Sequence, residues 1–272
     1  MVSASWERRH PGRPELWGFD FFTADASLGG FVGLTFLPDR RRCWYWAALV
    51  GDGRPYLLVR DLQVTLPRLP TSREIRSEAL WADMNCETSF EHWSLGLEAF
   101  GVAMDDPDEA LGAERGDRVG LGLDLEWESV GDIVGTEGSY DQPGVVHGEI
   151  LVGGAGVERI AFEGHGWRRH AWRRHDERPA DWMTAPRSWL GGRLDDSTPH
   201  RSGTVGEEVL IETLHRAPMV LEADGGPVVL ERRLCRFDDP LAGSGVAWVE
   251  WFGGHVPRGP TGKNQPVPGG DS

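Results

Sequence analysis

The sequence predicts an all-β protein made of two antiparallel, sheet-rich halves, each a barrel or a sandwich. Segments in which apolar and polar residues alternate recur along most of the 272 residues, and 37 Gly and 18 Pro separate them. Alternation places successive side chains on opposite faces of a strand, whereas Gly and Pro form turns. Because an open sheet edge invites pairing with other chains, closure into barrels of about eight strands is the expected arrangement.

Strands follow one another along the first half of the chain. Gly51 and Gly53 mark a hairpin, because glycine supplies the positive φ that tight turns need. The acidic, Pro-containing segment 105–117 is the one helix-like or loop insert. After it, four apolar residues alternate with acidic ones, so one face of this strand should line a sheet interior; they are Leu121, Leu123, Leu125 and Trp127. The predicted strands are 16–24, 29–37, 41–51, 54–66, 77–89, 90–104 and 119–129.

A Gly-rich polar stretch, residues 129–145, is the best internal boundary. It predicts an N-terminal domain over 1–135, a C-terminal domain over 136–255 and a disordered tail over 256–272, which has no apolar pattern. The predicted strands of the second half are 145–154, 158–172, 187–196, 207–216, 218–224, 226–239 and 245–254.

Charge and cysteine content exclude several classes of protein. The net charge of −15 disfavours binding to nucleic acid or to an anionic membrane surface. Three widely spaced cysteines without a CxxC motif argue against a disulfide framework or a cysteine zinc site. There is no apolar N-terminal segment and no run of 18 apolar residues. A cytoplasmic protein without membrane insertion is expected, and homodimer formation stays open.

Residues 162–183, FEGHGWRRHAWRRHDERPADWM, interleave Trp, His and Arg. His165, His170 and His175 are five residues apart, so on a strand neighbours in this series point to opposite faces, and no metal site is expected. Arg with aromatic residues also suits single-stranded nucleic acid, but the chain has no second basic patch of similar strength.

The same segment resembles the lining of a small-molecule site. On a strand, Arg168, His170, Trp172 and Arg174 share one face, where Arg offers a fixed charge, His a proton relay and Trp an apolar wall. The structural alternative is that these residues join the two halves, with Arg paired to the abundant carboxylates.

Other candidates lie in the first half. Glu87 and Glu91 share the parity of Trp93, so two carboxyl groups could lie on an apolar face, where burial would raise their pKa and suit them to donate a proton. The alternative places both at a strand end, exposed or paired with Arg. Trp44 and Trp46 point to the same side and could line a pocket, although core packing is the more economical interpretation.

The Trp-Arg-His segment is similar to the middle signature of the hydroxyneurosporene synthase (carotenoid hydratase) superfamily, as a divergent actinobacterial-type member. Residues that match this signature and a C-terminal one are Gly164, Gly166, Arg168, His170, Trp172, Arg174, Trp182, Gly243, Gly245 and Glu250. Arg169, Ala171 and Arg173 depart from the pattern, in which Asp, Ser and Gly stand at those places. The resemblance implies two lipocalin-like β-barrel domains with an apolar pocket at or between them, and chemistry without metal or redox cofactor.

These observations predict a cofactor-independent enzyme that hydrates or cyclises an apolar isoprenoid, steroid-like or polyketide substrate. His170 or Glu91 would transfer the proton, and Arg168 would hold an anionic or carbonyl group. Trp93 and Trp172 would shape the substrate and stabilise positive charge. A carrier or sensor without turnover is the first alternative, favoured by the lost Asp and Ser, and a scaffold whose Trp and Arg join the halves is the second.

Overall fold

The computed structural model describes residues 3–172, 188–190, 193–195, 210–223, 226–239 and 243–252. The protein is all-β, as predicted. The helices of the described residues are short 3₁₀ turns, η1 (Ala4–Glu7), η2 (Pro38–Arg40) and η3 (Pro107–Leu111). None of the helices within these ranges is long and apolar enough to cross a membrane. The tail predicted over 256–272 lies outside the described residues.

Eight antiparallel strands form a closed, lipocalin-like barrel in the order β4-β3-β2-β1-β11-β10-β8-β7. The circuit closes where Tyr56, Leu57 and Leu58 of β4 pair with the end of β7. Two further strands continue the sheet beyond β7, and β9 pairs with β10. The strands of this sheet are β1 (Glu15–Phe22), β2 (Leu28–Leu37), β3 (Arg42–Gly51), β4 (Tyr56–Thr65), β5 (Ile75–Ser77), β6 (Leu80–Thr88), β7 (His92–Met104), β8 (Asp117–Ser129), β9 (Val134–Thr136), β10 (Ser139–Gly153) and β11 (Val157–Trp172).

A second antiparallel sheet has the order β13-β12-β16-β15-β14. Predicted strands 207–216 and 218–224 are parts of one strand, β14, which continues through Pro218. Proline is tolerated there because β14 is an edge strand, where a ladder hydrogen bond is not required on the outer side. The strands are β12 (Ser188–Leu190), β13 (Arg193–Asp195), β14 (Leu210–Ala223), β15 (Gly226–Asp239) and β16 (Gly243–Phe252).

The two sheets do not divide at the predicted boundary. The position between residues 135 and 136 falls inside β9, and β10 and β11, placed in the C-terminal half, complete the barrel by pairing with β8 and β1. The division between the sheets follows Trp172 instead. The assignment of separate folding domains stays a prediction.

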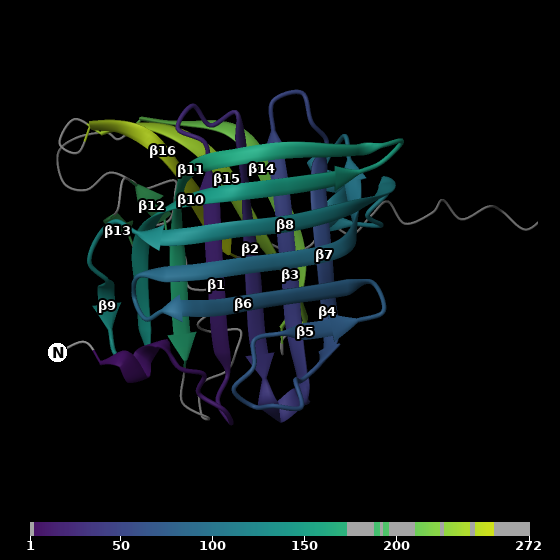
Figure 1. The fold of residues 1–272 in the computed structure, drawn as a ribbon. Coiled ribbons are helices and arrows are strands. Elements are labelled where there is room, and N and C mark those ends of the chain that lie inside the picture. The colour runs from purple at the N-terminus through teal and green to yellow at the C-terminus, as the bar shows by residue number, and fades with distance from the viewer. Residues whose placement is uncertain are drawn as a thin grey trace, which may run out of the picture.

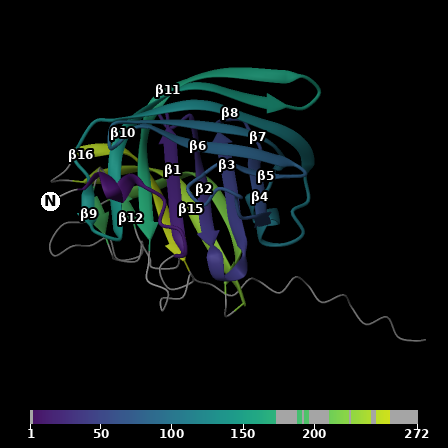
Figure 2. The same cartoon turned by 60° about the horizontal axis from the view of Figure 1, so that its bottom comes forward.

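Three layers arise from this topology (Figures 1 and 2): β6, β7, β8 and β10 run across β1–β4, and β14–β16 lie behind β1–β4. Two apolar cores result, one inside the barrel and one between β1–β4 and the second sheet. Every residue of β2 is buried, because both faces of this strand are covered. On β3, Cys43 and Tyr45 face the barrel core, whereas Trp44 and Trp46 face the second core.

The predicted alternation holds on the strands that matter for function. The apolar residues of β8 predicted to share one face line the barrel core, and Asp124 and Glu128 are exposed on the other. On β11, Arg168, His170 and Trp172 lie on the barrel side, and Ala171 contacts the second core. Arg174 lies outside the described residues. His165 is exposed while His170 is buried, so these two imidazoles do not converge, as the spacing predicted.

Glycines let β11 approach β1 closely. A Cβ added to Gly166 would lie 2.0 Å from the carbonyl oxygen of Asp20, and one at Gly164 would lie 2.2 Å from that of Phe22. Real side chains cannot occupy such positions without a shift of the backbone, so the two glycines of the Gly-x-Gly motif are required by packing between β1 and β11.

We expect Gly166→Ala to lower the free energy of unfolding by roughly 1–3 kcal/mol or more, the usual cost of overpacking. Gly156→Ala is the matched control, because a Cβ there meets nothing within 4 Å. Urea denaturation of both variants measures the difference, and equal stability of the two would contradict the close approach of β1 and β11.

Candidate functional site

One end of the barrel is filled by charged and polar side chains from four elements. The N-terminal segment with η1 lies beside the ends of β9 and β10 (Figure 2) and sends side chains into this end. We call the following set the closed-end network: Glu7, Arg9, His10, Glu15, Tyr140, Gln142, Arg168 and His170. All but His10 are buried.

Arg168 is fixed by hydrogen bonds and by contacts with aromatic rings. Its Nη2 donates to Oε1 of Glu7 at 2.7 Å, and its Nε donates to Oε1 of Gln142 at 3.0 Å. The hydroxyl of Tyr140 and the indole of Trp93 also donate to Glu7, the latter at 3.2 Å. The guanidinium stands 5.1 Å from the ring centre of Trp127. With 1% exposure, Arg168 is a buried, paired cation.

His170 belongs to a second group around Glu15. Its Nε2 lies 2.8 Å from Oε1 of Glu15, while Nε of Arg9 lies 2.9 Å from Oε2. The imidazole stacks on Trp17 with 3.4 Å between ring centres. Because a carboxylate only accepts hydrogen bonds, Nε2 of His170 carries the proton. The other ring nitrogen, Nδ1, has no hydrogen-bond partner.

Burial determines the protonation state of His170, whereas hydrogen bonds and charge determine that of Glu15. Burial lowers the pKa of His170 to about 4, against the opposite effect of the hydrogen bond and charge of Glu15. For Glu15, burial acts to raise the pKa, but hydrogen bonds with His10 and His170 and the charge of Arg9 outweigh it and lower the pKa to about 2. At neutral pH the pair is therefore a carboxylate and a neutral imidazole.

Within the closed-end network there is no room for a ligand beside His170 and Glu15. His170 and Glu15 are 0% exposed, which leaves no water-sized space beside them. His10, Glu15 and His170 have ligand atoms within 4.8 Å of one another, a set that metal ions use. A cation there would face the guanidinium of Arg9 on the same carboxylate. The arrangement fits a hydrogen-bonded trio better than a metal centre.

A second charged group lies between the sheets. We call it the inter-sheet cluster. Arg169 on β11 pairs with Asp141 at 2.8 Å and reaches Glu250 on β16 at 3.6 Å. Arg232 on β15 pairs with Asp20 on β1 at 3.0 Å. Arginine residues thus join the barrel to the second sheet, as the structural alternative for this segment predicts. The contact from β11 is made by Arg169 and not by Arg168.

Asp20 is a buried carboxyl group of the inter-sheet cluster. Burial raises its pKa, although the charge of Arg232 and a hydrogen bond from the backbone N–H of Trp167, 2.9 Å long, act in the opposite direction. Asp20 is not among the predicted site residues. The signal was an acidic residue inside the apolar run Leu16–Phe22, on a strand whose two faces are both covered.

Glu87 and Glu91 do not lie on the apolar face where they were expected. Both are exposed, and Glu87 accepts hydrogen bonds from Asn85 and Ser94. A register shift between Cys86 and Thr88, followed by a turn before β7, interrupts the alternation. Parity counted across this hairpin therefore assigns Glu87 and Glu91 to the wrong face.

The predicted tryptophans separate into two groups. Trp93 and Trp172 border the closed-end network, where Trp172 stacks on His10 with 4.2 Å between ring centres. Trp44 and Trp46 are buried in the second core, and Trp46 covers Gly33, where a Cβ would lie 2.2 Å from its ring. The structure thus brings together Arg168, His170, Trp93 and Trp172, and separates them from the other four predicted residues.

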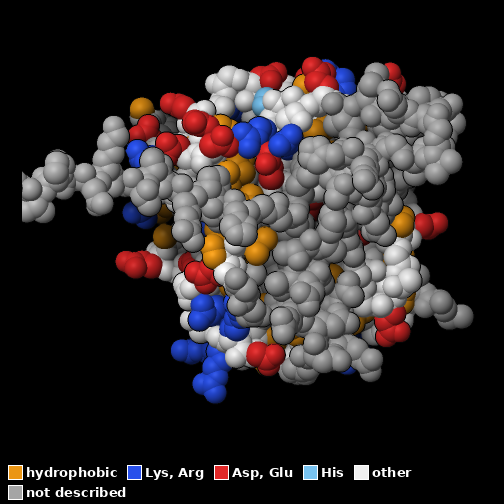
Figure 3. Space-filling view, turned by 180° about the vertical axis from the view of Figure 1, so that it is seen from behind, with side chains coloured by type: hydrophobic (Ala, Val, Ile, Leu, Met, Phe, Trp, Pro, Cys, Tyr) orange, Lys and Arg blue, Asp and Glu red, His pale blue; other side chains and the backbone are white. Residues whose placement is uncertain are grey.

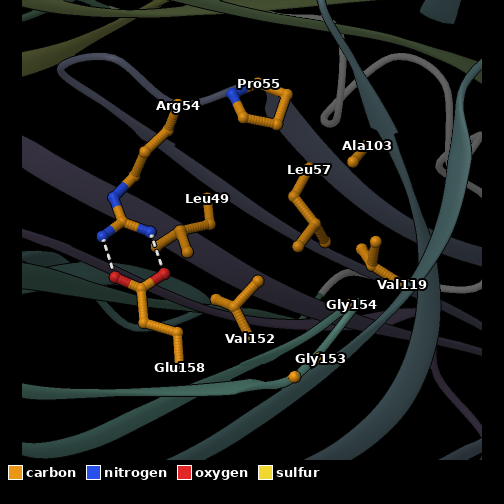
Figure 4. A pocket seen from close by; sticks show the side chains of 11 residues that line it. Leu49, Arg54, Pro55, Leu57, Ala103, Val119, Val152, Gly153, Gly154 and Glu158 are labelled. Carbon is orange, nitrogen blue, oxygen red and sulfur yellow. Dashed lines mark hydrogen bonds and ion pairs between the residues drawn. The ribbon is translucent and has the colours of Figure 1, made fainter.

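The opposite end of the barrel is open. A pocket of about 280 Å³ lies between the β3–β4 hairpin, the β10–β11 hairpin and the facing ends of β7 and β8 (Figure 4). We call it the mouth pocket. Its apolar lining includes Leu49, Pro55, Leu57, Ala103, Val119 and Val152. Leu49 and Leu57 belong to the barrel core, so the pocket is an accessible extension of that core.

An ion pair crosses the rim of the mouth pocket. Both terminal nitrogens of Arg54 donate to Glu158, at 2.7 and 2.5 Å, and Figure 4 shows the pair beside the apolar lining. These residues come from two hairpins far apart in the sequence, so no local pattern could have identified the pair.

A larger hollow of about 550 Å³ lies where β4 meets β14 and β15, but its lining alternates apolar residues with Arg60, Asp61, Gln63 and Glu222. Arg60 donates to the carbonyl oxygen of Val220 and pairs with Glu114. Seen from behind, acidic and basic side chains likewise stand next to one another on the described surface (Figure 3). The mouth pocket is the more apolar of the two.

The family is shown by a sequence comparison. The family model described as a domain of unknown function (DUF7064) matches residues 3–201. A comparison with curated proteins found no match.

Three solved structures are similar to this chain. A crystal structure assigned to AttH from Nitrosomonas europaea has a TM-score of 0.43 and 14% identity, over 88% of this chain and 92% of the other. CghA with Sch210972 has a TM-score of 0.36 and 10% identity, over 88% of this chain and 57% of CghA. CghA without that compound gives a TM-score of 0.35, with 11% identity and the same coverage.

The pKa of His170 gives a prediction on stability. An unfolded histidine has a pKa of about 6.5, so between about pH 4 and 6.5 the unfolded chain binds the extra proton and stability rises with pH. We expect His170→Gln to lose less stability than the unmodified protein as the pH falls from about 6.5 to 4. Denaturation at a series of pH values measures this, and parallel curves would contradict a neutral, buried His170.

The pairing of Arg168 gives a second prediction. Arg168→Met leaves Glu7 buried without its cation, so we expect a loss of about 3–5 kcal/mol in unfolding free energy, partly restored by adding Glu7→Gln. Arg76→Met, in a pair whose arginine side chain is 73% exposed, should cost less than about 1 kcal/mol. Additive effects of Arg168→Met and Glu7→Gln in a double-mutant cycle would show that the pair is not coupled.

Proposed function

The chain belongs to the family described as a domain of unknown function (DUF7064), and we propose that it binds a small apolar molecule in the mouth pocket, as a carrier or sensor. The observation that carries this proposal is the pocket itself, an accessible, mainly apolar hollow continuous with the barrel core. Small-molecule sites in proteins are concave and mostly apolar, with few polar groups that orient the ligand, and barrel mouths are common places for them.

The described polar residues support binding rather than turnover at the predicted positions. His170 and Arg168 are packed at the closed end, and Glu91 is exposed on a turn. None of the three lines the mouth pocket. A ligand held at the mouth would meet apolar side chains and the rim ion pair, which orient it but offer no unpaired acid or base.

A second candidate is the cofactor-independent enzyme implied by the resemblance to the hydroxyneurosporene synthase superfamily. The observation that favours it is the inter-sheet cluster, where the buried carboxyl group of Asp20 has a raised pKa beside Arg232. In its protonated form, Asp20 could protonate an alkene of an apolar substrate that reaches it, which starts either hydration or cyclisation. In this candidate Asp20, not Glu91, would be the acid.

The two candidates differ in what happens to the ligand. Native mass spectrometry of freshly purified protein is expected to show a small molecule bound at one copy per chain. Recovery of that molecule unchanged after incubation supports the carrier. A product heavier by one water molecule, or an isomer of the same mass, formed by the protein but not by Asp20→Asn, supports the enzyme.

Filling the mouth pocket tests where the molecule binds. Ala103→Phe places a ring among the lining residues and should weaken binding roughly tenfold or more, because little of a ligand could then be enclosed. Ala113→Phe, at an exposed position that does not line the pocket, is the control. Unchanged occupancy in Ala103→Phe, measured by native mass spectrometry or titration calorimetry, would place the ligand elsewhere.

A further inference from the structure

At the rim of the mouth pocket, Arg54 binds the carboxylate of Glu158 and could bind the carboxylate of a ligand in its place. Arg54 and Glu158 form two parallel hydrogen bonds, the arrangement in which a guanidinium recognises a planar carboxylate. They are the charged members of the pocket lining, and the remaining lining residues are apolar or glycine. A ligand bound in the pocket would therefore have this pair at its edge.

The two partners are held unequally. Arg54 sits in the tight β3–β4 turn, where its N–H donates to the carbonyl oxygen of Gly51 at 3.2 Å, and its side chain is 28% exposed. Glu158 is 50% exposed, near the start of β11, where the strand pairs with β10 on one side and reaches β1 only from His165 onward. Glu158 has the more exposed side chain, so we expect it to be the partner that leaves.

Exchange of one carboxylate for another costs little. Exposed ion pairs contribute little to stability, because water competes for both partners. A ligand carboxylate would make the same two hydrogen bonds, while its apolar part gains burial against Leu57, Val119 and Val152. We therefore expect the free energy gained by burying the apolar part of the ligand to favour binding of the ligand carboxylate over that of Glu158.

The volume limits the size of the ligand. At about 30 Å³ for each water-sized group, a pocket of about 280 Å³ holds roughly nine such groups. A saturated chain of about eight carbons matches this volume. One terminal carboxylate matches the single charged pair of the lining, Arg54 and Glu158.

We propose that the mouth pocket takes a medium-chain carboxylate, with the apolar chain among Leu57, Val119 and Val152 and the carboxylate bound by Arg54 in place of Glu158. This inference rests on the proposed binding function and adds the chemical class of the ligand and the residue that selects it.

Titration calorimetry with three probes of equal chain length tests the head group: octanoate, 1-octanol and octylamine. Octanoate should bind most tightly. Arg54→Gln should weaken octanoate binding roughly tenfold, as expected for loss of a charge-assisted bidentate contact, and leave 1-octanol unchanged. Glu158→Gln should strengthen octanoate binding, because the competing carboxylate is gone.

Arg159→Gln is the matched control. Arg159 pairs with Glu149 at 2.7 Å on the same β10–β11 hairpin, is 71% exposed and does not line the pocket. Arg159→Gln changes the net charge by the same amount as Arg54→Gln. If both variants weakened octanoate binding equally, net charge rather than contact with Arg54 would explain the effect, and the proposal would be overturned. Circular dichroism and melting temperatures confirm that each variant is folded.

The remaining outcomes separate this inference from the proposed function. If octanoate and 1-octanol bind equally and Ala103→Phe abolishes both, the pocket binds apolar molecules but Arg54 does not select a carboxylate. If octylamine binds best and loses affinity in Glu158→Gln, the selected head group is a cation and the proposal is wrong. If none of the probes binds, both the inference and the proposed function fail.

Discussion

The structure depends on the burial of β1–β4 on both faces. Strands covered on one side by the barrel interior and on the other by a second sheet cannot expose a polar group to water, so each such group must find a partner or remain uncharged. Glu15 is paired inside the barrel, whereas Asp20, on the other face of the same strand, is paired across the sheets. Both paired carboxyl groups are a consequence of this burial.

The same burial on both faces applies to the end of β11 that carries Arg168, Arg169 and His170. Arg168 and His170 point into the barrel and complete the closed-end network, while Arg169 points to the second sheet and joins it. One strand therefore closes the barrel and fastens the second sheet. Trp, Arg and His are frequent on this part of β11 because both of its faces are buried. The charged groups on each face need partners.

The two ends of the barrel therefore differ in packing. The closed end is filled by side chains from the N-terminal segment, β1, β10 and β11, and has no free volume at Arg168 or His170. At the other end, turns and glycines leave the apolar core accessible, with Arg54 and Glu158 as the charged rim. A ligand can enter the mouth without breaking any buried ion pair.

The sequence by itself determined the fold class, the faces of β8 and β11 and the grouping of Arg168, His170 and Trp172, because alternation along a strand is a local property. Only the tertiary structure decided which face met which partner. Alternation did not predict the faces of Glu87 and Glu91 correctly, because a register shift and a turn intervene. The mouth pocket and the burial of Asp20 depend on strands far apart in the chain. Pairing of β1 with β11, and of Arg54 with Glu158, joins residues far apart in the chain, and such contacts arise from closure of the barrel rather than from any local pattern.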